Sequence, residues 1–356
     1  MKRSSPPIYF RLENLSGEYN KDLVGGKAKS LGKLISQGLN VPKGICIPTN
    51  VYTSFITQTG LDKKIMFELS RKNFGDMRWE ELWDAALRIR NLFLKAELPS
   101  KLVKQLKEIL EDEAGNKPLV VRSSSISEDS KKKSFAGLHE SFVNIVGIDA
   151  IIHHLKLVWA SLWSDKALLY KQELGLNVNN SKMAVVIQEL IEGEKSGVAF
   201  GLSPMNQKYM IIESVYGLNQ GLVDGEIAPD RWTILRESGE IIDFHGEPHE
   251  YYVKTAQGGK EESRVKKIKL DPSLHNKPPL SDNQVRKIYN TSKILEEIYQ
   301  SPQDMEWTFK DDNLYVLQSR PITFIDQRND TDEIEYYSKN WYLSLHKSYV
   351  SLEKLR

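Results

Sequence analysis

The sequence predicts a protein of the α+β class, and three observations lead to this prediction. Residues 49–113 carry apolar side chains at helical spacing, which is typical of several amphipathic helices. Residues 183–232 contain short apolar runs separated by glycine-rich turns, which favours strands. Two more such runs, 303–309 and 314–321, are joined by the polar stretch 310–313 and predict a β-hairpin. Helical and strand-rich regions are therefore segregated along the chain.

Composition limits the classes of partner and compartment. The chain has 356 residues, enough for two or three subdomains with a sizeable core. Its 49 Lys and Arg residues nearly cancel its 48 Asp and Glu residues, so no broad field favours nucleic acid or an anionic membrane. Cys46 is the only cysteine, which excludes an internal disulfide and favours a reducing compartment. With no apolar stretch of membrane-spanning length and no secretory signal, we expect a soluble cytoplasmic protein.

The first candidate phosphate-binding feature is a glycine pair followed by lysine. Gly25 and Gly26 predict a turn, and the apolar spacing that follows them predicts a helix. Lys27 would lie in the first turn of this helix, where backbone N–H groups and the helix dipole favour an anion. The spacing differs from that of a Walker A loop, so a lysine that contacts no phosphate is the alternative.

A second candidate lies in residues 118–142. The apolar run 119–121 predicts a buried strand, and Arg122 follows it directly. A guanidinium at a strand end can form bidentate hydrogen bonds to phosphate oxygens. An acidic serine-rich segment and a basic triplet then lead to the turn 134–137, whose backbone can approach the same anion. A solvated surface loop is the alternative.

Two other patterns have a plainer interpretation. Trp79 and Trp83 recur at helical spacing, which predicts that they belong to the core rather than to a ligand platform. His153 and His154 are adjacent, so their side chains diverge around a helix, and no third ligand is near. A metal site is not predicted there.

The predicted hairpin carries the candidate metal ligands. Pairing across it brings Glu306 near Gln318, with Arg320 just beyond. Carboxylate and amide oxygens suit Mg²⁺, which takes a few hard oxygen ligands and leaves positions for phosphate oxygens. An exposed polar hairpin face is the alternative.

The order of these motifs resembles that of a known family. It is similar to the N-terminal ATP-binding domain, an ATP-grasp domain, of phosphoenolpyruvate synthase, pyruvate phosphate dikinase and rifampicin phosphotransferase. The resemblance covers about residues 15–325. It departs from the family where 138–139 read Leu-His in place of common glutamines, and where 228–230 read Ala-Pro-Asp in place of Asn-Pro-Asp or Thr-Pro-Asp. The motifs that carry it are Gly25 to Ala28, Val121 to Ser124 with Glu128-Asp129, Ser134 to Gly137, Gln188-Glu189, Ser196 to Phe200, Gly225 to Asp230, Asp304 to Trp307, and Gln318 to Pro321.

The resemblance implies a division of the chain. The fold would be an ATP-grasp fold, with a helical N-terminal part and two β-rich subdomains that enclose a nucleotide cleft. The implied parts are residues 1–115, helical and carrying Lys27; 116–190, with the phosphate loop and the adenine hinge; 191–325, the β-rich core with the Mg²⁺ site; and 326–356, a linker or tail.

The resemblance also implies a role for each site residue. Lys27 and Arg122 would hold the phosphates of ATP, and Arg320 would stabilise charge on the transferred group, so that these three form the catalytic set. The remaining implied contacts are Gly137 and Ser141 on the loop over the phosphates, Gln188 at the adenine hinge with the backbone near Glu189 and Leu190 reading the base, and Glu306 and Gln318 as ligands of Mg²⁺.

The implied reaction needs more than this chain. Members of the family pass phosphate to a histidine on a swivelling domain, in a Gly-Gly-x-Thr/Ser-x-His-Ala context, and a further domain binds the acceptor. None of the seven histidines here has that context. We therefore expect an ATP-dependent phosphotransferase domain that acts with those domains in a longer enzyme or in a separate chain. Pyruvate is the expected final acceptor; the alternatives are rifampicin, or a nucleotide-binding module without catalysis.

Overall fold

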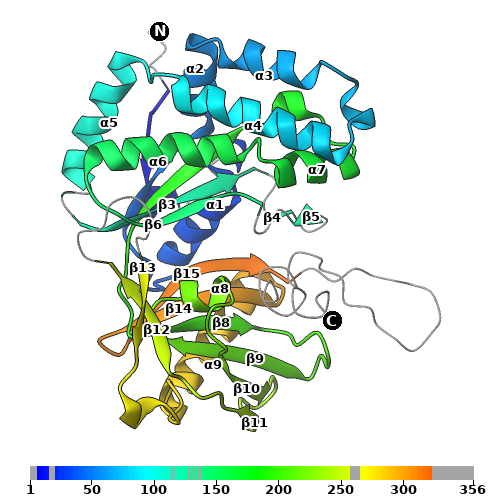
Figure 1. The fold of residues 1–356 in the computed structure, drawn as a ribbon. Helices are drawn as coiled ribbons and strands as arrows, with labels where there is room; N and C mark the ends of the chain where they lie inside the picture. Colours follow the sequence, from blue (N-terminus) through cyan, green and yellow to red (C-terminus); the bar gives the residue numbers. More distant parts are fainter. Residues whose placement is uncertain are drawn as a thin grey trace. The chain divides into compact units, whose positions relative to one another are not determined.

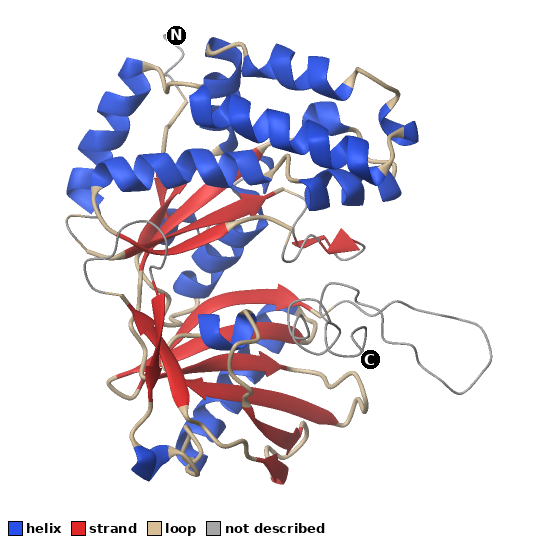
Figure 2. Cartoon of the chain, in the orientation of Figure 1, coloured by secondary structure: helices blue, strands red, loops and turns tan. Residues whose placement is uncertain are grey.

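The structure is a computed structural model that describes residues 6–15, 21–113, 115, 117–126, 129–130, 133–134, 138–256 and 265–322. It confirms the α+β class, since sheets and helices build both compact units of the chain (Figures 1 and 2). Unit 1 comprises Met1–Ser36, Lys43–Glu128 and Gly137–Leu190, and unit 2 comprises Gln37–Pro42, Asp129–Ala136 and Ile191–Arg356.

The helices and strands have the following bounds. The α-helices are α1 (Lys21–Ser36), α2 (Thr49–Gln58), α3 (Leu61–Leu69), α4 (Trp79–Lys95), α5 (Ser100–Glu113), α6 (Ile148–Ser161), α7 (Asp165–Glu173), α8 (Gln220–Val223) and α9 (Asp282–Tyr299). The strands are β1 (Phe10–Arg11), β2 (Gly44–Ile47), β3 (Leu119–Ser125), β4 (Asp129–Ser130), β5 (Lys133–Ser134), β6 (Ser141–Ile145), β7 (Met183–Glu189), β8 (Lys195–Phe200), β9 (Tyr209–Tyr216), β10 (Asp230–Leu235), β11 (Ile241–His245), β12 (Tyr251–Thr255), β13 (Val265–Lys269), β14 (Gln303–Lys310) and β15 (Asn313–Pro321).

Unit 1 is built on a five-stranded antiparallel sheet in the order β1-β2-β7-β3-β6. Alternate strand residues such as Val121, Val185 and Ile187 point to one face and join a single apolar core with helices α2 to α7. Figure 2 shows these helices gathered on that side of the sheet. Helix α1 covers the other face, where the Cys46 thiol contacts the Val24 carbonyl. The unit therefore has three layers, and α1 stands alone on one of them.

The tryptophans of α4 correct a prediction. The helix buries Leu82, Ala85, Ala86, Ile89 and Phe93, which form its core-facing stripe. Trp79 and Trp83 share a different face and are 55% and 47% exposed, so the prediction that they belong to the core is wrong. Helical spacing shows that two residues share a face, but the smaller Leu, Ala and Ile side chains of α4 form the face that packs.

Unit 2 is built on a six-stranded antiparallel sheet in the order β11-β10-β9-β8-β14-β15. Helix α9 packs against β8, β14 and β15 and begins at Ser281, whose side chain caps the helix together with Gln284. A Cβ added to Gly201 would lie 3.2 Å from Oγ of Ser292 in α9. Within β8, the Lys195 ammonium donates to Oε1 of Gln284 in α9 at 2.9 Å, so the face of β8 that carries Lys195 points to α9. Two two-stranded ribbons, β12–β13 and β4–β5, complete the described part of the unit.

The predicted hairpin is confirmed as β14 and β15. Its two-residue turn, Asp311 and Asp312, has φ of 49° and 58°, the left-handed values of a type I′ turn. The segment 37–42 lies along the outer side of β15, because the Asn40 carbonyl accepts a 2.8 Å hydrogen bond from the Val316 N–H. The outer edge of the sheet is therefore partly paired.

Each unit is made of several separate segments of the chain. The change from unit 1 to unit 2 after Leu190 coincides with the implied start of the β-rich core. The implied boundary at 115/116 falls inside unit 1, because β1 and β2 share a sheet with β3, β6 and β7. The implied linker or tail, 326–356, lies outside the described residues. Among the helices of the described chain, none is long and apolar enough to cross a membrane.

Candidate active site

In unit 1, the glycine–lysine motif and the arginine motif meet. Gly25 interrupts the helical conformation with φ of 77°, and Lys27 follows in the first regular turn, as predicted. The Ser124 hydroxyl donates to the Val24 carbonyl at 2.8 Å and accepts from the Ala28 N–H at 3.0 Å. A Cβ on Gly25 would lie 2.0 Å from the Ser124 carbonyl oxygen, so only glycine fits this approach.

The close packing of Gly25 against Ser124 fixes the position of Lys27 beside the end of β3. The Lys27 side chain is 6% exposed, and its ammonium donates to the Ser123 carbonyl at 2.9 Å. Ser123 directly follows Arg122 in β3. The two cations predicted for phosphate binding are therefore held by one local arrangement, in which the serines of the arginine motif fix the turn of the lysine motif.

Arg122, Ser141 and Gln188 lie on the same face of the sheet of unit 1 as α1. Arg122 pairs in register with Ser141 on β6 and with Val186 on β7, and Gln188 follows Val186 by two residues. Side chains in register, and those two residues apart, share a face. The same face carries Ser124, which contacts α1. The structure thus brings these three predicted residues to the layer that contains Lys27.

The end of β7 departs from the prediction in one respect. The N–H of Glu189 already donates to the Lys43 carbonyl at 2.9 Å, and that of Leu190 donates to the Pro118 carbonyl at 3.0 Å. The Glu189 carboxylate forms an ion pair with Lys117. Within the part of the chain that the structure describes, the Leu190 carbonyl and the Ile191 N–H form no hydrogen bond. A base read by this stretch would therefore meet that carbonyl and that N–H.

In unit 2, the hairpin register is the one predicted from the sequence. Glu306 pairs with Gln318, and Asp304 pairs with Arg320 two residues away on the same face. The Arg320 Nε donates to Asp304 Oδ2 at 2.6 Å. A bulge between Glu306 and Trp307 shifts the register by one residue, so that Glu306 pairs with Gln318 rather than with Leu317.

Asp304 has an unusual environment. Its side chain is almost fully buried, and Oδ1 has no hydrogen-bond partner within the described chain. Burial raises the pKa of its carboxyl above the usual range, and the charges of Glu306 and Glu213 act in the same direction, whereas Arg320 opposes them. A buried carboxylate with one unsatisfied oxygen is costly to keep without a further partner.

Sequence reasoning missed three residues of these arrangements. Ser124 and Asp304 lie within the quoted motifs, and Asp304 precedes Glu306 by two residues, so strand alternation alone would have placed both acids on one face. Glu213 on β9 is 4% exposed and belongs to no predicted ligand set. Its relation to the hairpin follows only from the order of the strands.

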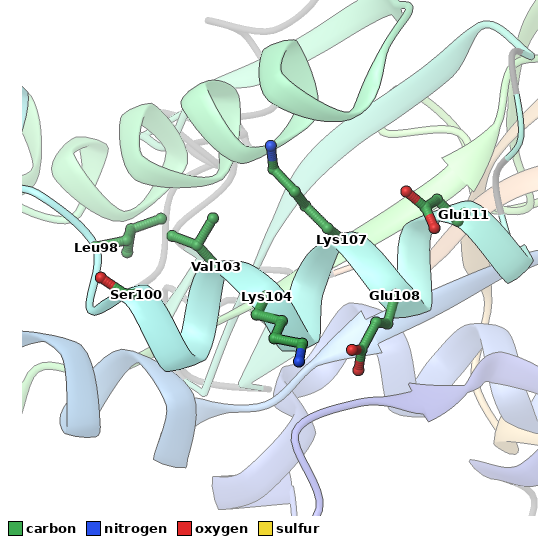
Figure 3. A pocket seen from close by; sticks show the side chains of 7 residues that line it. All are labelled: Leu98, Ser100, Val103, Lys104, Lys107, Glu108 and Glu111. Atoms are coloured by element: carbon green, nitrogen blue, oxygen red, sulfur yellow. The ribbon is translucent and has the colours of Figure 1, made fainter.

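Other features of the described chain do not add to the site. Gly137, predicted for the phosphate loop, lies outside the described residues. A hollow along α5 is lined by Leu98, Ser100, Val103, Lys104, Lys107, Glu108 and Glu111, and Figure 3 shows Lys107 directed to one side of the helix and Glu108 to the other. Its polar groups do not converge. No cluster of three or more His, Cys, Asp or Glu in the described parts could hold a metal by itself.

Comparison with known proteins gives consistent matches. The family model for the pyruvate phosphate dikinase AMP/ATP-binding domain matches residues 21–340. A probable phosphoenolpyruvate synthase of Archaeoglobus fulgidus is 33% identical over 88% of this chain and 41% of its own length. The probable phosphoenolpyruvate synthase of Methanothermobacter thermautotrophicus is 30% identical over 90% of this chain and 46% of its own length. The rifampicin phosphotransferase of Bacillus cereus is 30% identical over 89% of this chain and 36% of its own length.

The chain thus spans less than half the length of these curated relatives. Among solved structures, D-alanine–D-alanine ligase of Bacillus anthracis complexed with ATP is 12% identical, with a TM-score of 0.30 over 92% of this chain and 67% of that one. The family model covers nearly the whole chain, and it includes every residue of the predicted site. The chain belongs to the pyruvate phosphate dikinase AMP/ATP-binding domain family.

Proposed function

We propose that this chain is the ATP-binding phosphotransferase domain of a phosphoenolpyruvate synthase-like enzyme. It would transfer phosphate from Mg-ATP to a histidine on a separate swivelling domain. The observation that carries the proposal is the arrangement around Gly25, where Ser123 and Ser124 hold Lys27 against β3, the strand that carries Arg122, in a chain of this ATP-binding family. Two cations so fixed suit the phosphates of a nucleotide.

Unit 1 would bind the phosphates, and the chain that follows β7 would bind the base. Lys27 and Arg122 would neutralise phosphate charge, with Ser141 opposite Arg122 at the start of β6 and Gly137 on the loop before it. Gln188 would mark the adenine hinge. The Leu190 carbonyl and the Ile191 N–H offer an acceptor and a donor, which match the amino group and N1 of adenine. Guanine presents the opposite pattern, so we expect ATP to bind more tightly than GTP.

The hairpin of unit 2 would hold Mg²⁺. Glu306 and Gln318 offer a carboxylate and an amide oxygen from paired positions, and the unsatisfied Oδ1 of Asp304 lies on the same face. This donor set fits Mg²⁺, which takes one or two carboxylates and completes its shell with phosphate oxygens and water. When bound, the ion would supply charge neutralisation at the phosphates. Arg320, held by Asp304, would keep its guanidinium oriented toward charge on the transferred group.

The remaining steps would need further domains. We infer that a phosphohistidine swivelling domain and an acceptor-binding domain act with this one, and that pyruvate is the final acceptor. Rifampicin remains the second candidate because rifampicin phosphotransferases match as well as the synthases do over the same residues. We also infer a cytoplasmic enzyme, on the single cysteine of the chain.

Titration calorimetry with Mg-ATP tests the proposal. The wild-type chain, Arg122→Ala and Glu306→Ala are compared, each with and without Mg²⁺. We expect Arg122→Ala to weaken ATP binding about tenfold or more, as for loss of a charge-assisted contact. Glu306→Ala should lose most of the Mg²⁺ dependence. Charge-matched controls are Arg11→Ala, whose side chain pairs with Glu113 at the surface, and the exposed Glu237→Ala.

The outcome that contradicts the proposal is absence of nucleotide binding by the wild-type chain. Equal effects of the site variants and of their controls would contradict the assigned contacts. Transfer itself is tested by adding a histidine-bearing domain of a relative, with pyruvate or rifampicin, and by measuring the AMP formed. ATP binding without AMP from either acceptor would favour the non-catalytic alternative.

A further inference from the structure

A row of polar side chains crosses the sheet of unit 2. Arg231 on β10 pairs in register with Glu213 on β9, which pairs with Val198 on β8, which pairs with Glu306 on β14. Gln318 on β15 ends the row. Residues in register point to the same face of a sheet. Since Val198 alternates with the residues that point to α9, the row lies on the face opposite this helix.

The far end of the row is an ion pair with a fixed geometry. The Nε and Nη2 atoms of Arg231 both donate to Oε1 of Glu213, at 2.9 and 2.6 Å. The Glu213 side chain is 5% exposed, whereas that of Arg231 is 51% exposed. In the described part of the chain, Nη1 of Arg231 forms no hydrogen bond. A buried carboxylate therefore holds a guanidinium whose remaining donors face outward.

An arginine bound by a buried acid also occurs at the other end of this face. Arg320 is held by the buried Asp304, again through a single carboxylate oxygen. Two arginines, each fixed by a buried acid, thus flank the Glu306–Gln318 pair. At roughly 4.8 Å per strand, Arg231 and Glu306 are about 14 Å apart at their Cα atoms, which suits a chain of phosphates rather than one phosphate.

We propose that Arg231 is a second phosphate-binding arm of the ATP site, and that Glu213 is its positioning residue. The inference deepens the proposed function and rests on it. Arg231 contacts the polyphosphate beyond the α-phosphate, because a guanidinium fork fits phosphate oxygens and the metal ligands lie in the same row. The competing explanation is an ordinary surface ion pair, which contributes little to binding or to folding.

The test compares nucleotides that differ only in the length of their phosphate chain. ATP, ADP and AMP are titrated, with Mg²⁺, into the full chain and into Arg231→Ala, Arg231→Lys and Glu213→Gln. We expect Arg231→Ala to weaken ATP about tenfold and to leave AMP within about twofold. Arg231→Lys keeps the charge without the fork and should lose part of the affinity. Lys287→Ala is the matched control, since Lys287 pairs with Asp312 on the α9 side and carries the same charge.

Glu213 has its own readout. If it acts through Arg231, Glu213→Gln weakens ATP less than Arg231→Ala, and the double variant binds ATP as Arg231→Ala does. Additive losses, or equal losses for ATP and AMP, would overturn the positioning role. An unchanged ratio of ATP to AMP affinity in Arg231→Ala would overturn the inference about Arg231. If the wild type still binds ATP, that result does not contradict the proposed function. No ATP binding by the wild type would overturn both.

Discussion

At the scale of single residues, Gly25 is the position on which the turn before Lys27 depends. Its φ is 77°, and a Cβ added to it would lie 2.0 Å from the Ser124 carbonyl oxygen. Both observations exclude a side chain at this position. We expect Gly25→Ala to lower the free energy of unfolding of unit 1 by about 2–5 kcal/mol, from backbone strain and the clash together. Urea denaturation measures this loss.

The control separates strain from clash. Gly60 also has a positive φ, of 66°, but nothing lies within 4 Å of its built Cβ. Gly60→Ala should cost only about 1–2 kcal/mol, the cost of a left-handed conformation. Equal losses in the two variants would contradict the view that the close approach to β3 requires glycine at position 25.

Lys171 gives a residue-scale prediction for pH. It is buried in α7, where its ammonium donates to the Leu162 carbonyl at 2.9 Å and lies 4.8 Å from the centre of the Trp163 ring. Burial lowers the pKa of Lys171 to about 7. Between about pH 7 and pH 10.5 the unfolded chain keeps a proton that the folded chain releases, so this group makes stability rise with pH in that window.

Lys171→Met should remove that rise. We expect the stability of the wild type relative to this variant to increase from pH 7 to pH 10 by up to about 4 kcal/mol, at no more than about 1.4 kcal/mol per pH unit. Denaturation at pH 6.5, 8 and 9.5 measures it. Lys101→Met, at an exposed site on α5, is the control. A difference that stays constant with pH would show that Lys171 remains charged when folded.

At the scale of elements, the turn before β8 packs tightly on the hairpin of β14 and β15. A Cβ on Gly193 would lie 1.7 Å from Oγ1 of Thr308 on β14 and 2.9 Å from the Phe309 carbonyl. Gly193→Ala should therefore displace β14 and destabilise unit 2 by about 1–3 kcal/mol. Thr308→Ala removes the nearest atom, so the double variant should recover part of the loss, with a coupling energy of about 1 kcal/mol in a denaturation cycle. Strictly additive losses would argue against this contact.

The elements also show what the sequence could predict. The hairpin was predictable because two apolar runs flank a short polar turn, but the register of that turn alone would pair Glu306 with Leu317. The bulge after Glu306 brings Gln318 opposite it instead. The position of Lys27 followed from the glycines before it. Trp79 and Trp83 were placed wrongly, because spacing gives a shared face without saying which face packs. The position of the Glu213–Arg231 pair relative to the hairpin was not predictable. Strands β9 and β8 lie between β10 and the hairpin, and this order of strands is set by tertiary packing.

At the scale of the whole molecule, each unit has its own sheet and its own core. Separate cores favour separate unfolding transitions, so thermal unfolding of the nucleotide-free chain should not be two-state. Scanning calorimetry should give a calorimetric enthalpy larger than the van't Hoff enthalpy. Gly25→Ala should shift one component and Gly193→Ala the other. A single transition that both variants shift equally would contradict this expectation.

The course of the chain has a consequence for how the protein is made. The segment 37–42 belongs to unit 2, yet it is synthesised between α1 and β2 of unit 1. Its partner on β15 appears on the ribosome 274 residues after Asn40. During translation this segment must therefore stay unpaired while unit 1 folds around its ends. A gene divided after Leu190 would give a first polypeptide that contains segment 37–42 of unit 2. The second polypeptide would contain β15 without the segment that pairs with its outer side.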